Sequence, residues 1–206
     1  MTWELLSIIG TIAFAVSGAI VAMEEEYDIL GVYILGIVTA FGGGAIRNLL
    51  IGLPVTALWN QSTSFIIALM SITLVFLFPN NLLKHWRIWG NFTDAIGLAA
   101  FAIQGALYAV KMQMPLSGII VAAVLTGSGG GIIRDLLAGR KPLVFKDEIY
   151  AVWAILCGAL IGWGLAEKPW ELYFLFLAIT LLRILSYKYK WRLPYRAYSK
   201  KERLSP

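Results

Sequence analysis

Two short glycine-rich stretches lie 87 residues apart in this chain. Gly-Gly-Gly-Ala-Ile-Arg-Asn occupies residues 42–48, and Gly-Gly-Gly-Ile-Ile-Arg-Asp occupies residues 129–135. Each glycine in a helix interior costs about 1 kcal/mol relative to alanine. Because both stretches lie inside long apolar segments, we expect the glycines to kink or unwind two helices. The alternative is close helix packing, since glycine allows backbones to approach each other.

The two stretches belong to a longer internal repeat. When the chain is aligned with itself at an offset of 87 residues, residues 10–52 match residues 97–139 without a gap. The identical pairs include Phe14 with Phe101, Gly18 with Gly105, Thr39 with Thr126, and Arg47 with Arg134. Biased composition alone would not keep this register, so the sequence predicts two copies of one structural unit.

The composition indicates an all-α integral membrane protein. The chain has 206 residues, of which 59% are hydrophobic and only 14% charged, whereas soluble domains have about 25% charged residues. A helix needs about 20 apolar residues to cross the hydrocarbon core of a bilayer. Seven stretches are apolar enough, at approximately 4–23, 29–51, 62–79, 92–110, 116–138, 149–166 and 171–188.

These stretches predict one transmembrane domain, residues 1–188, followed by a basic cytoplasmic tail, residues 189–206. The first repeat covers about 4–79, the second about 91–166, and the last helix, 171–188, stands outside both. Because each repeat holds three helices, the second copy enters the membrane from the opposite side. Such inverted repeats place substrate or ion sites near the midplane, where helices are broken.

The distribution of lysine and arginine predicts the orientation. With the C-terminal tail in the cytoplasm, twelve of these residues lie in inside loops or the tail, and two in outside loops. This asymmetry follows the positive-inside rule. We therefore expect a multi-pass protein of the cell membrane with its N-terminus outside. The basic tail is either a topology signal or a binding site for anionic lipid heads. Because the tail accounts for most of the excess positive charge, we expect no nucleic-acid partner.

Four charged residues lie within the predicted spans, near the glycines, and their charges sum to zero. Intramembrane charges are costly and are usually paired or hydrated. Since Arg134 and Asp135 are neighbours on a helix, about 100° apart, we expect each to find its partner on another helix. Arg47 and Arg134 are predicted to form a structural charge network. The candidate ion path comprises Gly42, Gly43, Gly44, Gly129, Gly130, Gly131, Asp94, Asp135, Asn48, Thr39, Thr126 and Ser128.

The duplicated glycine motif with its arginine, set within seven spans, resembles the trimeric intracellular cation (TRIC) channels and, more closely, their bacterial relatives. The similarity extends from about residue 5 to 185. It implies a homotrimer with a K⁺- and Na⁺-permeable pore in each subunit, framed by the second and fifth helices. The family usually has an aspartate before the first-helix glycine and another after the arginine. The second repeat keeps both, as Asp94 and Asp135, whereas the first has Ser7 and Asn48.

A second hypothesis is secondary transport of glycine or another small amino acid, which has been assigned to some bacterial members of the same family. A half-helix N-terminus can bind a carboxylate, and Asp94 or Asp135 an ammonium group. We expect no enzyme activity and no cofactor or metal other than the permeating K⁺ or Na⁺. The chain has one histidine and one cysteine, and its spans contain no carboxylate pair at helical spacing.

Overall fold

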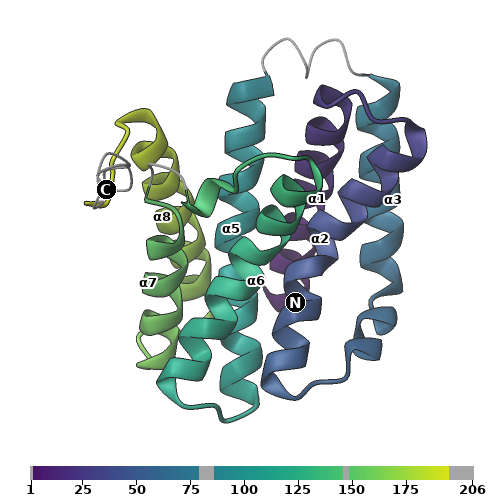
Figure 1. Ribbon diagram of the computed structural model, residues 1–206. Helices are drawn as coiled ribbons and strands as arrows, with labels where there is room; N and C mark the ends of the chain where they lie inside the picture. Colours follow the sequence, from purple (N-terminus) through teal and green to yellow (C-terminus); the bar gives the residue numbers. More distant parts are fainter. Residues whose placement is uncertain (1, 79–85, 146–148, 195–206) are drawn as a thin grey trace, which may run out of the picture.

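The computed structural model describes residues 2–78, 86–145 and 149–194, and the regular secondary structure of this part of the chain is entirely helical (Figure 1). Two short 3₁₀ helices, η1 (Val55–Asn60) and η2 (Leu143–Phe145), lie in the connections. The predicted loop cations Lys84 and Lys146, and the basic tail beyond Pro194, lie outside the described residues. The seven α-helices of this part are α1 (Thr2–Glu24), α2 (Ile29–Ile51), α3 (Ser62–Leu77), α5 (Trp86–Lys111), α6 (Leu116–Leu137), α7 (Ala151–Gly162) and α8 (Pro169–Lys188).

Every predicted span corresponds to one of these helices, but the helices differ in length. Five of them, α1, α2, α5, α6 and α8, are long and apolar enough to cross a membrane. The apolar helices α3 and α7 have only 16 and 12 residues. At 1.5 Å per residue they extend about 24 and 18 Å, less than the roughly 30 Å of a bilayer core.

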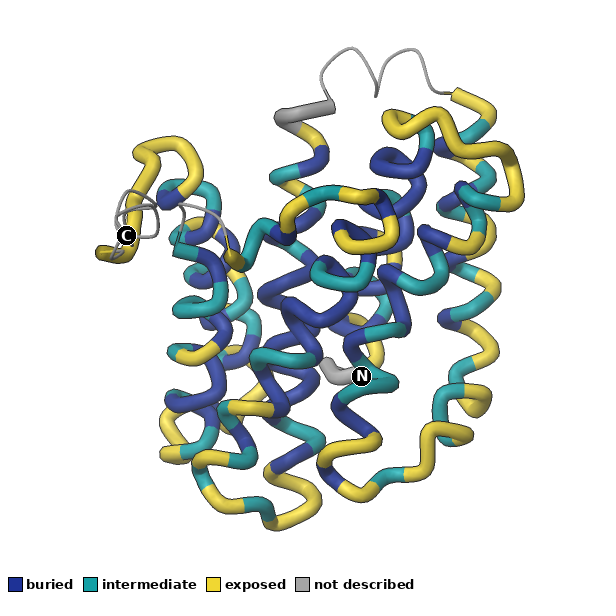
Figure 2. Tube along the Cα trace, viewed as in Figure 1, coloured by how far each residue is buried: buried dark blue, intermediate teal, exposed yellow. Residues whose placement is uncertain are grey.

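The four helices that carry the internal similarity form the centre of the bundle. α1 packs on α2 and α5, and α6 packs on α2 and α5. The outer helices flank this centre, with α3 on one side and α7 and α8 on the other (Figure 1). Buried residues follow the central helices, whereas the outer helices have long exposed strips (Figure 2). Those strips are apolar, as at Leu74, Phe174 and Leu177, which suits contact with lipid.

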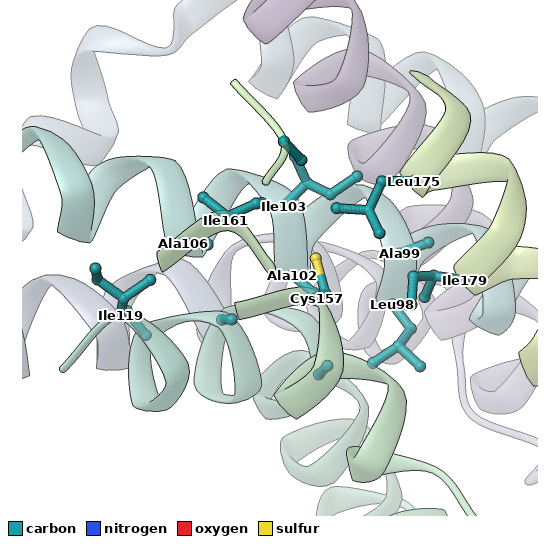
Figure 3. Packing of buried hydrophobic residues seen from close by; sticks show 14 of the residues in the cluster. Leu98, Ala99, Ala102, Ile103, Ala106, Ile119, Cys157, Ile161, Leu175 and Ile179 are labelled. Carbon is teal, nitrogen blue, oxygen red and sulfur yellow. The ribbon is translucent and has the colours of Figure 1, made fainter. Parts of the chain in front are cut away.

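Two hydrophobic clusters lie on either side of the centre. One fills the space between α5, α6, α7 and α8 and includes Leu98, Ile119 and the buried Cys157 (Figure 3). The other lies between α1, α2 and α3 and includes Leu35 and Ile72. Small residues are frequent in both clusters, so the helices can approach closely without a thick layer of side chains.

The crossing of α1 and α5 shows residues 87 apart in equivalent places. The rings of Phe14 and Phe101 meet edge to face, with centroids 5.1 Å apart. Each ring also covers a glycine of the other helix. A Cβ on Gly97 would lie 2.1 Å from Phe14 Cδ1, and one on Gly10 would lie 2.7 Å from Phe101 Cε1. These two glycines therefore provide the space into which the phenylalanines fit.

The prediction that the glycine runs unwind two helices is wrong. α2 continues as one α-helix through residues 42–44, and α6 does so through residues 129–131. The physical reason is the crossing of these two helices. A Cβ on Gly43 would lie 2.6 Å from the Thr126 carbonyl oxygen, and one on Gly130 would lie 2.0 Å from the Thr39 carbonyl oxygen. The alternative of close packing is therefore correct for the middle glycine of each run.

Candidate functional site

The site is centred where α1, α2, α5 and α6 meet, and its polar groups are buried. Thr39 donates a hydrogen bond to the Leu35 carbonyl oxygen at 2.6 Å, and Thr126 donates to the Ala122 carbonyl oxygen at 2.6 Å. Ser128 does the same to Val124, also at 2.6 Å. Each hydroxyl hydrogen is thus used within its own helix, and only oxygen lone pairs remain for another partner.

The uninterrupted helices also change the role predicted for the glycine carbonyls. In a continuous α-helix each carbonyl oxygen accepts a hydrogen bond from the amide four residues later. The carbonyl groups of residues 42–44 and 129–131 are therefore occupied within α2 and α6. In this conformation each of these oxygens has one lone pair left for another partner.

Arg134 on α6 is the centre of a buried charge network. Its Nη1 donates to Asp94 Oδ1 on α5 at 2.9 Å and to Ser17 Oγ on α1 at 2.5 Å. Its Nε and Nη2 contact Asp135 Oδ1 at 2.9 and 2.8 Å. Arg134, Asp94 and Asp135 are all at most 4% exposed. The arginine thus joins three helices, with two carboxylates beside one guanidinium.

Asp135 is bonded differently from the prediction. Instead of finding its partner only on another helix, it pairs with the adjacent Arg134. The long arginine side chain folds back to the carboxylate, so the 100° between the two Cβ directions does not separate the charged groups. The second oxygen of Asp135 accepts a hydrogen bond from the Leu143 amide at 2.9 Å. The carboxylate therefore also fixes the segment that follows α6.

Arg47 on α2 is the counterpart of Arg134, but no carboxylate of the described residues pairs with it. Its Nε and Nη2 donate to Asn48 Oδ1 at 3.1 and 2.8 Å. The guanidinium carbon lies 4.0 Å from the centre of the Tyr108 ring, a favourable cation–π contact. Arg47 is 2% exposed, and its Nη1 is buried without a hydrogen-bond partner. The first repeat thus keeps the cation of the network and lacks both acids.

A small pocket adjoins Arg47, and a wider cavity shares part of the lining of that pocket. A pocket of about 10 Å³ is lined by Arg47 together with Gly44, Thr126, Gln61 and Gln104. A wider cavity of about 320 Å³ shares Gln61 and Gln104 with it, and its lining also includes Glu4, Ser7 and Tyr108. The small pocket has room for roughly one water molecule. On the Arg134 side, the space lined by Ser128, Gly131, Asp135 and Tyr150 is too small for a water molecule.

Three aromatic and basic residues of the site were not anticipated from the sequence. The Tyr108 ring stacks on the Arg47 guanidinium, and Tyr150 lines the same small space as Arg134. Arg183 on α8 is 2% exposed, with its guanidinium carbon 4.6 Å from the centre of the Tyr150 ring. Tyr150 and Arg183 lie outside residues 10–52 and 97–139, so the ungapped alignment at 87 residues gives no signal for them.

The predicted site residues therefore fall into two clusters with different charges. Asp94 and Asp135 meet at Arg134, and Asn48 meets Arg47. The threonines and the glycines form the crossing between the clusters. Across residues 2–78, 86–145 and 149–194, no group of three or more His, Cys, Asp or Glu side chains is placed to hold a metal ion.

Comparison with known proteins identifies relatives of the whole bundle. A family model described as glycine transporter matches residues 4–80 and again residues 91–167. The two matches begin 87 residues apart, the offset of the internal similarity. The UPF0126 membrane protein YvgT of Bacillus subtilis (strain 168) is 73% identical over 198 residues, covering 96% of this chain and 98% of the relative.

Solved structures give the same fold. A prokaryotic TRIC channel crystallised in 0.5 M KCl superposes with a TM-score of 0.85 at 34% identity, covering 93% of this chain and 98% of the other. The TRIC orthologue from Rhodobacter sphaeroides gives a TM-score of 0.83 at 32% identity, covering 92% and 98%. The chain is thus a multi-pass membrane protein of the UPF0126 family, whose family model is described as glycine transporter, and it has the fold of the TRIC channels.

Proposed function

We propose that the protein is a passive channel for monovalent cations, K⁺ and Na⁺, with one pore in each protomer of a homotrimer. The observation that carries this proposal is the similarity to prokaryotic TRIC channels at about one-third identity over more than 90% of both chains. Those relatives are trimeric cation channels. The polar interior of the bundle supplies a route consistent with the same activity.

The proposed route runs between the central helices. It begins at the wider cavity beside Glu4 and Ser7, continues past Gln104 to the pocket at Arg47, and ends near Ser128 and Asp135. The Arg134 cluster contains two carboxylates, Asp94 and Asp135, whose oxygens would interact favourably with a passing cation. The pocket at Arg47 measures only about 10 Å³ and is the constriction of this route. Conduction requires this constriction to widen.

The alternative is a carrier for glycine or another small amino acid. The match to a family model described as glycine transporter favours it, and the 320 Å³ cavity is large enough for such a molecule. A carrier alternates between two conformations and saturates with its substrate, whereas an open channel passes ions without a conformational cycle for each one.

Flux into liposomes distinguishes the two functions. We expect purified protein to admit radioactive rubidium, a substitute for K⁺, far faster than protein-free liposomes do, without saturation at millimolar concentrations and without an effect of glycine. The same liposomes should not accumulate labelled glycine. Saturable glycine uptake with no rubidium flux would contradict the channel and establish the carrier.

We further propose that the chain lies in the cell membrane with its N-terminus outside. Lys111 is the last residue of α5, and Lys141 follows the end of α6. Both lysines are exposed, and this orientation places them on opposite sides of the membrane. In spheroplasts, a Lys111→Cys variant is expected to react with a membrane-impermeant maleimide, and Lys141→Cys only after lysis. The native Cys157 is buried and gives little background. The reverse labelling pattern would show the opposite orientation.

A further inference from the structure

The unusual feature of the first repeat is a buried positive charge without a counterion. Within the described part of the chain, Arg134 forms ion pairs with two aspartates, whereas Arg47 forms none. Asn48 offers Arg47 only a neutral amide oxygen, and Tyr108 offers only a ring face. A buried charge that is neither paired nor hydrated is strongly unfavourable. The position therefore calls for a negative charge, and the described part of the chain supplies none within ion-pair distance of Arg47.

The surroundings of the unpartnered nitrogen are suited to an anion. Arg47 lines the small pocket, and its Nη1 is buried without a hydrogen-bond partner. Gln61 and Gln104 line the same pocket, and their side-chain amides carry N–H donors. A guanidinium with additional N–H groups is the donor set that proteins use for carboxylates and other small anions.

We propose that the Arg47 guanidinium binds a small monovalent anion in this pocket, either chloride or the carboxylate group of a small organic molecule. The anion occupies the electrostatic role that Asp94 and Asp135 have at Arg134. It compensates the charge left by Ser7 and Asn48, the residues that stand at the positions equivalent to those two aspartates.

The adjoining cavity gives the anion a way in. The cavity of about 320 Å³ meets the small pocket at Gln61 and Gln104. It is large enough to hold the remainder of a small carboxylic acid or amino acid whose carboxylate contacts Arg47. Chloride needs only the inner pocket, after an adjustment of the surrounding side chains. The site is independent of whether cations permeate.

The thermal stability of the purified protein tests this site directly. Chloride, acetate and glycine are titrated separately in detergent, with the ionic strength held constant by the bulky HEPES anion. We expect at least one of them to raise Tm saturably, by about 5 °C when the anion is in large excess over its Kd. Saturation by chloride identifies a halide site. Saturation by acetate and glycine without chloride identifies a carboxylate site.

The decisive variant is Asn48→Asp, which supplies the carboxylate that the second repeat has as Asp135. We expect it to raise Tm without added anion and to abolish the anion dependence. Asn60→Asp is the matched control, because Asn60 is exposed and lines only the wider cavity, and it should keep the wild-type response.

Three results would overturn the proposal. The first is a wild-type Tm that does not respond saturably to any of the three anions. The second is an anion response that Asn48→Asp leaves unchanged, and the third is an equal loss of response in Asn60→Asp. None of these measurements uses ion flux, so a failure of the anion site and a failure of the proposed channel are distinguishable.

Discussion

Replacing Arg134 with methionine is expected to cost about 3–5 kcal/mol of stability, enough to prevent accumulation of the folded protein. The substitution keeps an unbranched apolar stem and removes the guanidinium, so Asp94 and Asp135 remain as buried, unpaired charges. It also removes the link to Ser17 on α1. The amount of monodisperse protein after detergent extraction and its Tm measure the effect.

Arg47→Met is the matched control for that prediction. It removes a buried arginine at the equivalent position, but no carboxylate loses its partner, because Arg47 is bonded to Asn48. In HEPES without chloride or small carboxylates, we expect its cost to be about 1 kcal/mol or less, or a small gain, since replacing an uncompensated buried charge by an apolar side chain is often neutral or favourable.

A combined variant keeps the interpretation testable if Arg134→Met does not accumulate. Adding Asp94→Asn and Asp135→Asn removes both unpaired charges and should recover part of the lost stability. Equal losses in Arg134→Met and Arg47→Met, or no recovery in the combined variant, would show that the carboxylates are not the source of the effect.

The middle glycine of the second run is expected to be the most sensitive position at the helix crossing. In Gly130→Ala, the new Cβ would lie 2.0 Å from the carbonyl oxygen of Thr39. This neighbour is backbone, so relief requires α2 and α6 to move apart. Overpacking of this kind costs typically 1–3 kcal/mol and sometimes more, and we expect about 3 kcal/mol, measured as a fall in Tm.

The last glycine of the same run provides the control. In Gly131→Ala the nearest atoms, Asp94 Oδ1 and the Tyr150 hydroxyl, would both lie 3.6 Å from the new Cβ, an ordinary contact distance. Gly44→Ala in the first run is similar, with Arg47 Nη2 at 3.6 Å. Both variants should retain near-wild-type Tm. A Gly131→Ala variant as unstable as Gly130→Ala would contradict the crossing as described.

The positions of the helices were predictable because length and apolar composition dominate in a membrane. The segment predicted at 29–51 coincides with α2, and that predicted at 116–138 ends one residue beyond α6. The ends of the short α7 were harder to predict, since the apolar run predicted at 149–166 extends past both ends of the helix Ala151–Gly162. Hydropathy records apolar character and not the end of a helix, and Trp163 and Leu165 beyond α7 are apolar although they are exposed.

The local chemistry of the site was less predictable, because it depends on contacts between distant segments. Propensity correctly assigned a cost to three consecutive glycines, but it contains no term for Thr39 of α2 meeting Gly130 of α6. The pairing of Arg134 with Asp135 was missed because Cβ directions were considered without the reach of the arginine side chain. Tyr150 and Arg183 were missed because neither belongs to a repeated motif.

The measurement that tests the central claim most directly is the reversal potential of single-protein currents in a planar bilayer with asymmetric KCl. The proposed channel predicts discrete current steps that reverse near the potassium equilibrium potential. Reversal near the chloride potential would contradict cation selectivity. A silent bilayer, from a preparation whose liposomes accumulate labelled glycine, would contradict the channel itself.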